Sequence, residues 1–507
     1  MMSIDTRRAP RPPMLRALVP ALAAALLAAC TVGPDFVRPD PVGPGAQAPT
    51  AFARAADEAG TAIATDATST VAPAPTDDAF WRSFGDAQLT ALVEEALLAN
   101  NDLRIALARY DRANALLRNA RFDQIPTVTA QGLASTSRLS ADQAPGVPRA
   151  GRDDVESYSV AASAAWELDF FGRIRRNVEA ERADTEASAN DLAALQVAIV
   201  GDVARGYFEL RGLQERLRVA RDNAENQRDT LQLVQARFDA GRGTEFDTSR
   251  ARAQLEATLA NIPALEAAVA VTEHRIAVLT GRTPDALIGQ LDVAAPLPAL
   301  PDRLDPGTPG DLLRRRPDVI AAEHRLHAAT ARIGVATADL FPRFTLGGLI
   351  GSQAMDASAL FERDSETRVV ALGIDWSFLD AGRVRARIAA ADANAEGDLA
   401  SYRQSVLLAL EDTENALVRH ARARVEDQHR ERAALDSANA ARLARVRYEA
   451  GAIDLFEVLD AERSQLAAQD AFADARTRTA VSVVALYRAM AGGWPGRMPL
   501  REKIAGR

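Results

Sequence analysis

Residues 447–460 read RYEAGAIDLFEVLD and lie between two long stretches with helical periodicity. Gly451 ends a helix at low cost, because glycine adopts a positive φ without steric strain. The stretch therefore predicts the turn of a helical hairpin. Residues 237–247 (RFDAGRGTEFD) show the same arrangement 210 residues earlier, again with acidic residues after the glycine. Two such tips predict a duplicated fold.

The composition favours long, closely packed helices. The chain has 507 residues, which is too long for one simple core, with 25% charged and only 5% aromatic residues. Alanine dominates the apolar residues, and Lys503 is the only lysine. The net charge of −9 and the pI near 5.4 argue against a nucleic-acid partner.

Residues 1–29 are predicted to be a lipoprotein signal peptide. Four arginines precede an apolar run at 17–29, which is too short to span a bilayer as a helix. Residues 27–30 (LAAC) resemble the bacterial lipobox, in which the cysteine is acylated, for example with palmitate. Cys30 is the only cysteine, so no internal disulfide is possible. The alternative is a secreted protein with an unmodified Cys30. Thr31 in place of aspartate favours the outer membrane.

The mature chain is expected to begin with an extended, lipid-anchored tether over residues 30–80, which is rich in proline, alanine, threonine and glycine. No downstream segment approaches 18 consecutive apolar residues, which excludes a helical inner-membrane transporter. Helical periodicity starts near Asp86, and a second helix is predicted at about 102–122.

After Pro126 the period changes from helical to two. Residues 157–170 alternate between an apolar face with aromatic ends and a small polar face, which is typical of a membrane barrel strand. Residues 127–135 form a weaker partner strand, so a β-hairpin is predicted at about 126–170. A soluble, half-buried hairpin remains the alternative for this stretch alone.

The longest helical pattern covers residues 172–240 without a proline. As a continuous helix it would be about 100 Å long at ~1.5 Å per residue, and its seven-residue spacing predicts a supercoiled seam. A shorter helix returns after the tip at 241–247, and Pro263 is expected to kink it or to mark a join between helices. These elements form a first repeat at 81–290, followed by a linker at 291–310.

A second repeat is predicted at 311–493, followed by a tail at 494–507. Asp318 and Pro342 match residues 216 positions earlier, whereas Trp376, Gly382 and Gly451 match residues 210 positions earlier. The difference falls in the hairpin loop, so the second hairpin, at about 342–380, has a shorter loop. Its tip lies at 451–460. The same strand–loop–strand insert in both repeats favours membrane strands.

Each chain is therefore expected to supply four strands, which cannot close a pore. An open sheet edge cannot face lipid, so several chains must share one barrel. A trimer gives a 12-stranded barrel, an even number in the known range. The helices would then continue the barrel as a long α-helical tube.

The chain resembles the TolC-like outer-membrane efflux factors of the lipoprotein branch. The resemblance rests on four features: residues 30–36 (CTVGPDF), residues 311–319 (DLLRRRPDV), the paired Trp-to-Gly-Arg segments and the paired glycine tips. It implies a mixed α/β membrane protein, namely a homotrimeric β-barrel in the outer membrane continued by a periplasmic α-helical barrel. It also implies a passive exit duct of a tripartite drug-efflux system that contributes to antibiotic resistance. The expected partners are a periplasmic adaptor and an inner-membrane transporter of the resistance-nodulation-division type.

The resemblance also implies the site residues. Glu457 and Asp460 match two acids that line the periplasmic gate, and Phe456 would add an apolar constriction. Asp247 and Tyr448 match positions that latch neighbouring hairpins. A basic latch partner of some relatives corresponds to Ile453, for which Arg463 is the expected substitute. Without the resemblance, each tip acid would be read as an ordinary solvated carboxylate near a helix N-terminus.

No pattern in the sequence predicts catalysis, a cofactor or a metal. The pair His324 and His327 has the wrong spacing for the metalloprotease helix, and no nucleophile or phosphate-binding motif occurs. Three alternatives to the efflux duct remain: a duct for type I protein secretion, a periplasmic coiled-coil lipoprotein without a pore, and a lipid-anchored enzyme. The coiled-coil alternative predicts no β-structure.

Overall fold

The computed structural model describes residues 31–42, 49–54, 79–138, 140, 142, 154–301, 307–492 and 498–501. Cys30 and the predicted signal peptide lie outside these residues. The chain divides into two compact units. The first takes its described residues from 1–39, 111–187 and 322–401, and the second from 40–110, 188–321 and 402–507. Each unit therefore draws on both halves of the sequence.

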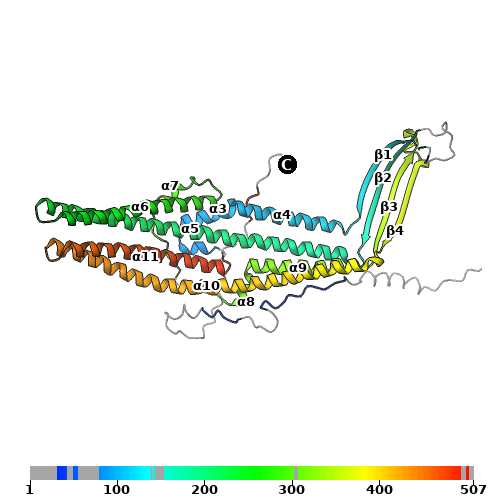
Figure 1. Cartoon of the computed structure of the whole chain (residues 1–507). Coiled ribbons are helices and arrows are strands. Elements are labelled where there is room, and N and C mark those ends of the chain that lie inside the picture. Colours follow the sequence, from blue (N-terminus) through cyan, green and yellow to red (C-terminus); the bar gives the residue numbers. More distant parts are fainter. Residues whose placement is uncertain are drawn as a thin grey trace, which may run out of the picture. The chain divides into compact units, whose positions relative to one another are not determined.

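The same order of helices and strands occurs in both halves (Figure 1). The first half contains α3 (Ala87–Ala99), α4 (Asn101–Phe122), β1 (Thr127–Ser137), β2 (Val155–Leu168), α5 (Arg173–Asp239) and α6 (Glu245–Leu279). The second half contains α8 (Pro309–Arg315), α9 (Pro317–Ala338), β3 (Arg343–Ala354), β4 (Glu366–Asp375), α10 (Ala381–Glu449) and α11 (Leu455–Ala489). The short elements η1 (Phe80–Phe84) and α7 (Ile288–Leu291) occur only in the first half among the described residues.

The helices confirm the pattern read from the sequence. Asp86 caps α3 by accepting a hydrogen bond from the Leu89 N–H at 2.8 Å, and α5 runs without interruption for 67 residues. Pro263 lies inside α6 without ending it, so of the two expected outcomes the join between helices is wrong, and the kink stays a prediction. A proline removes only one backbone hydrogen bond, and a 35-residue helix retains the others.

Helix α6 is also the one described helix that is long and apolar enough to cross a membrane by length and composition alone, and only 17% of that window is buried. It is long and apolar enough although Glu266 and Glu273 interrupt its apolar residues. A single helix that passes this test is weak evidence for a membrane span.

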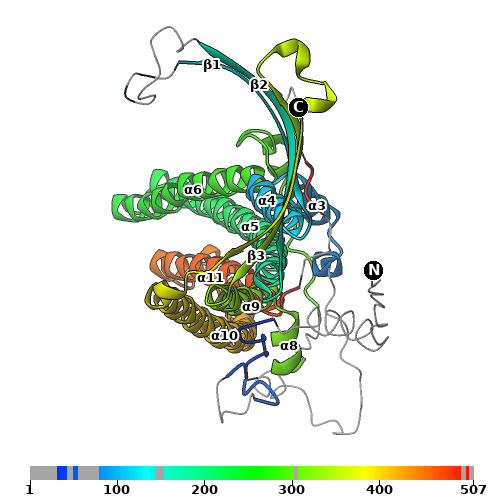
Figure 2. The ribbon, with the colours of Figure 1, turned by 90° about the vertical axis from the view of Figure 1, so that its right-hand side faces the viewer.

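The four strands form one antiparallel sheet in the order β1-β2-β3-β4, in the first unit. The two hairpins are joined by pairing between β2 and β3, in which Ala164 lies opposite Gly348. Figure 2 shows the strands lying side by side and curving along their length. Strands β1 and β4 each leave one edge unpaired among the described residues.

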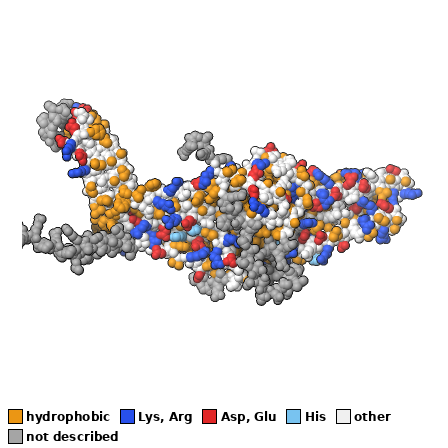
Figure 3. Space-filling view, turned by 180° about the vertical axis from the view of Figure 1, so that it is seen from behind, with side chains coloured by type: hydrophobic (Ala, Val, Ile, Leu, Met, Phe, Trp, Pro, Cys, Tyr) orange, Lys and Arg blue, Asp and Glu red, His pale blue; other side chains and the backbone are white. Residues whose placement is uncertain are grey.

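The strand register confirms the predicted alternation. One row across the sheet contains Val128, Ala164, Gly348 and Val370, and another contains Trp166, Leu346 and Leu372. These rows belong to the same face, which we call the apolar face. Its larger side chains are exposed, with Val370 at 83% and Leu372 at 61%. Figure 3 shows hydrophobic side chains over much of the sheet surface that it displays.

The strands are shorter at their helix ends than the alternation predicts. Phe170, Trp376 and Phe378 lie beyond the ends of β2 and β4. The Phe170 N–H donates to the Leu168 carbonyl at 2.8 Å, which turns the chain out of the extended conformation. The indole of Trp376 donates to the Leu340 carbonyl at 3.1 Å. Hydrogen bonds that the alternation does not reveal therefore accompany these strand ends.

Candidate functional site

The tips of the two helical hairpins, α5–α6 and α10–α11, lie side by side at one end of the second unit (Figure 1). A small apolar cluster joins them. Its buried members are Val234, Ala251, Tyr448, Leu455, Val458 and Leu459. Because this cluster takes residues from both hairpins, the two tips form one site.

The two turns have matching backbone geometry. Gly241 has φ +69° and Gly451 has φ +73°, a region that L-residues with side chains rarely adopt. The Arg242 N–H donates to the Arg237 carbonyl at 2.8 Å, and the Ala452 N–H donates to the Arg447 carbonyl at 2.9 Å. These hydrogen bonds close the same helix-terminating turn in each repeat. The glycines identified in the sequence therefore end both helices.

The acids that follow the two turns differ in their hydrogen bonding. Asp247 completes a capping box with Thr244, whose hydroxyl lies 2.7 Å from the carboxylate. Glu457 occupies the matching position in α11 and is exposed. Its carboxylate forms no hydrogen bond or ion pair with any described residue. Of these two acids, only Glu457 presents a free carboxylate at the tip.

The other residues predicted for the gate contact basic side chains. Asp460 accepts from the Arg463 guanidinium at 2.6 Å, and both side chains remain substantially exposed. Phe456 is 57% exposed, and the Arg250 guanidinium lies 5.0 Å from its ring centroid. Arg250 was missed from the sequence, although it occupies the position that matches Asp460 in the first repeat.

Tyr448 joins the two hairpins through Arg237. The Arg237 guanidinium lies 4.1 Å from the centroid of the Tyr448 ring and donates to the Tyr448 carbonyl at 3.0 Å. The structure shows no hydrogen bond between Asp247 and Tyr448, and Arg463 contacts Asp460 within its own helix. Within one chain, the three predicted latch residues are therefore not brought together.

Glu462, a buried carboxylate that was also missed from the sequence, lies in α11 two residues after Asp460. Glu462 is 3% exposed. Its Oε1 accepts from the Thr230 hydroxyl at 2.7 Å and from the Arg445 guanidinium at 2.9 Å. Arg445 also donates to the Asn226 carbonyl at 3.2 Å. One carboxylate thus connects α5, α10 and α11 beside the tips.

The segment that follows Cys30 is extended and is held against the first unit. The buried Arg176 donates to the Asp35 carboxylate at 2.5 Å and also bonds Glu179 at 2.9 Å. Phe36 stacks on His327, with ring centroids 4.5 Å apart. Arg38 pairs with Glu323 at 2.7 Å. The part of the predicted tether at 31–39 therefore occupies a defined position.

The histidines flagged in the sequence lie beside carboxylates in the same unit. His327 Nε2 is 2.8 Å from Glu179, and His324 Nδ1 is 3.1 Å from Glu186. Burial alone would raise the pKa of Glu179, but hydrogen bonds from His327 and Arg176 outweigh it and hold this pKa below its usual value. Glu179 is therefore charged at neutral pH and orients both of its donors.

Close glycine packing lets the 31–39 segment approach helix α9. A Cβ on Gly334 would lie 2.9 Å from the Val32 carbonyl. We expect Gly334→Ala to displace the segment and to increase the rate of chymotryptic cleavage after Phe36 by about tenfold, because a displaced segment opens more often. Gly397→Ala in helix α10 is the control, since its Cβ meets no atom within 4 Å. Equal cleavage rates in the two variants would contradict this role.

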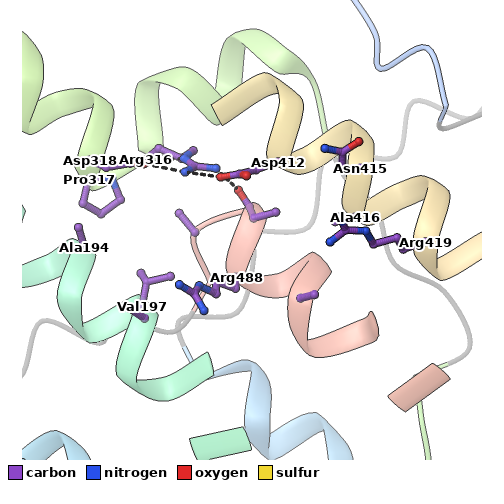
Figure 4. A pocket seen from close by; sticks show the side chains of 14 residues that line it. Ala194, Val197, Arg316, Pro317, Asp318, Asp412, Asn415, Ala416, Arg419 and Arg488 are labelled. Carbon is purple, nitrogen blue, oxygen red and sulfur yellow. Dashed lines mark hydrogen bonds and ion pairs between the residues drawn. The ribbon is translucent and has the colours of Figure 1, made fainter. Parts of the chain in front are cut away.

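A polar cavity of about 450 Å³ lies elsewhere in the second unit. Figure 4 shows Arg316 beside Asp412, with Arg488 from α11 nearby. Arg316 bonds Asp318 at 2.6 Å, Asp412 at 3.3 Å and the Ala489 carbonyl at 3.2 Å. Burial opposes its charge, but the two carboxylates outweigh burial and raise the pKa of Arg316. Arg316 therefore ties together the segments around α8, α10 and α11.

Comparison with known proteins agrees with this architecture. The family model described as outer membrane efflux protein matches residues 92–282 and 308–492. Outer membrane protein OprJ of Pseudomonas aeruginosa is 32% identical over 494 residues, covering 93% of this chain and 95% of that protein. The probable outer membrane lipoprotein SilC of Salmonella typhimurium is 30% identical over 422 residues, covering 82% and 88%. The solved structure of the outer-membrane channel OprN has a TM-score of 0.82 at 40% identity, covering 92% of this chain and all of that one.

A sheet with an exposed apolar face, in a chain that also has two long helical hairpins, is typical of a class of outer-membrane channels. The chain belongs to the outer membrane efflux protein family. It is an outer-membrane efflux channel, which confirms the resemblance drawn from the sequence. The four strands also contradict the alternative of a coiled-coil lipoprotein without β-structure.

Proposed function

We propose that the chain forms a homotrimer that serves as the exit duct of a tripartite efflux pump. Three copies of the four-stranded sheet, paired through the free edges of β1 and β4, would close a 12-stranded barrel. The observation that carries this proposal is the open sheet whose exposed face is apolar, because neither its edges nor that face is satisfied in a single chain. The same assembly is supported by membership of a family whose channels have a periplasmic helical tunnel.

The helical tips would form the periplasmic end of the duct. In a trimer, Glu457 and Asp460 would place six carboxylates around the axis, next to the three Phe456 rings. Carboxylates at this spacing repel one another and attract cations. The exposed, unpartnered carboxylate of Glu457 supports its place in this gate. Asp247, Tyr448 and Arg463 would act as latch residues between neighbouring hairpins, supplemented by Arg237.

The transported compounds would be drugs or other small toxic molecules that reach the duct from an inner-membrane transporter. A transporter of the resistance-nodulation-division type would supply the energy, and a periplasmic adaptor would contact the tips. Because that transporter would supply the energy, passage through the duct itself would be passive.

The duct is tested with purified protein in planar lipid bilayers. We expect heat-sensitive trimers on detergent gels and a small, cation-selective conductance, because the acidic tips both narrow the pore and attract cations. Well-folded trimers that conduct no current would contradict the duct. A monomeric protein would contradict the shared barrel.

We further propose that Cys30 carries a covalent lipid, which anchors the ordered segment at 31–39. Cys30→Ser is expected to abolish lipid attachment, for example of palmitate, because a hydroxyl cannot replace the thiol in lipobox processing. The measurement is the mass of the mature N-terminal peptide, and Thr31→Ser is the control. A lipidated mass in Cys30→Ser would contradict the assignment.

A further inference from the structure

One basic side chain lies on the apolar face of the sheet. The register places Arg368 of β4 opposite Ile350, which lies opposite Ala162 of β2. Arg368 is two residues further along β4 from Glu366, its first residue, and so lies near the loop end of the sheet. The other charged residues on this face, Glu156 and Glu366, lie at the same end. Arg368 is the only basic residue of this face within the four strands.

Arg368 has no counter-ion among the residues that the structure describes. Its exposed side chain forms no hydrogen bond or ion pair with a described residue, including Glu366 on the same face. A neighbouring β1 strand would not supply a carboxylate either, because residues 127–137 (TVTAQGLASTS) contain no charged residue. Pairing of β4 with a neighbouring β1 strand would therefore not by itself neutralise Arg368.

The position of Arg368 decides what compensates its charge. An arginine on the lipid face of a barrel costs about 2–4 kcal/mol at the bilayer midplane and about 0–1 kcal/mol near the interface. Two residues of a tilted strand place Arg368 about 5 Å below the loop end of β4. At this depth the guanidinium reaches the headgroup region, where phosphates are the available anions. A guanidinium binds phosphate through paired charge-assisted hydrogen bonds.

A groove that Arg368 itself lines runs across the strands between two neighbouring rows of the apolar face. It encloses about 630 Å³, and its apolar lining includes Val128, Ala164, Gly348 and Val370. Ala164 and Gly348 are paired in the register, so a methyl group and a bare backbone leave space between larger neighbours. The groove has room for one more side chain, because a Cβ on Gly348 meets nothing closer than the Val369 carbonyl at 3.8 Å.

We infer that this groove binds a phosphate-bearing lipid of the outer leaflet, with the phosphate on Arg368 and an acyl chain along Gly348 and Ala164. The inference rests on the proposed barrel, in which the apolar face meets lipid. The two parts adjoin, since Arg368 and Gly348 line the same groove and Arg368 belongs to its row nearer the loop end. The local feature that favours an anionic lipid is the guanidinium of Arg368, which lines the groove whereas Glu156 and Glu366 do not.

The experiment measures lipid binding to purified trimers by native mass spectrometry, with lipid A and the phosphate-free diacylglycerol as probes. We expect Arg368→Gln to raise the Kd for lipid A at least tenfold and to leave the Kd for diacylglycerol unchanged. Gly348→Leu, which fills the groove, is expected to weaken lipid A binding while Arg368 is intact. Arg343→Gln is the matched control, because Arg343 lies on the opposite face of the same sheet, where it pairs with Asp339.

The outcomes separate this inference from the proposed duct. Trimers that conduct normally but bind lipid A within twofold of wild type after Arg368→Gln would overturn the lipid site alone. An equal loss in Arg343→Gln would also overturn it, because the effect would then be general. Wild-type protein that forms neither trimers nor channels would overturn the duct itself.

Discussion

Replacement of Glu457 and Asp460 by serine is expected to enlarge the channel conductance roughly twofold or more and to reduce its cation selectivity. The reason is that six carboxylates near one axis would attract cations and hold hydrated ions in the narrowest section. Glu457 is exposed and has no partner among the described residues, and Asp460 is paired only with the exposed Arg463. Serine removes the charge and shortens both side chains.

The measurement is single-channel conductance and reversal potential in planar bilayers. The matched control is Asp222→Ser with Glu225→Ser, since these exposed acids on α5 have the same spacing of three residues. The control is expected to leave conductance unchanged. If the tip variant conducts like wild type in both size and selectivity, the duct stands and the gate lies elsewhere.

Glu462→Ala is expected to loosen the hairpin tips. It removes the carboxylate that joins Thr230 and Arg445 and leaves Arg445 without its ion-pair partner. Breaking a fully buried pair costs about 3–5 kcal/mol. Because the Arg445 side chain is 32% exposed, a smaller loss of about 2–3 kcal/mol is expected here.

Hydrogen exchange of the amides around residues 440–465 measures this loosening. Thr230→Val isolates the link between the hairpins, because it leaves the Arg445–Glu462 pair within the second hairpin. Its expected effect is about 1 kcal/mol. Thr258→Val is the control, since Thr258 is similarly buried but its hydroxyl bonds only the Gln254 carbonyl of its own helix. Unchanged exchange in Glu462→Ala would show that the buried carboxylate does not hold the tips.

The turns and strands of this protein were predictable because their signals are local. Gly241 and Gly451 mark positions of positive φ, which the backbone confirms. The alternation around Trp166 requires one face of a strand to be apolar, and the register confirms that face. Pro263 shows the limit of such signals, because a long helix tolerated a residue that usually interrupts one.

The partners of the site residues could not be predicted in the same way. Arg237 contacts Tyr448, and Arg250 contacts Phe456, across more than 200 residues of chain. These contacts depend on the rotation and register of one hairpin against the other. No local pattern in either hairpin encodes that arrangement.

The sequence by itself therefore determined the helices, the strands, the two tips and the family resemblance. The tertiary structure decided the partners of the tip residues, since Arg237 meets Tyr448 and Arg250 meets Phe456 only where the two hairpins pack together. It also divided the chain into units that mix both repeats. The physical reason is that helical period and glycine φ act within a few residues, whereas hydrogen bonds between hairpins form only once the packed helices fix their side chains.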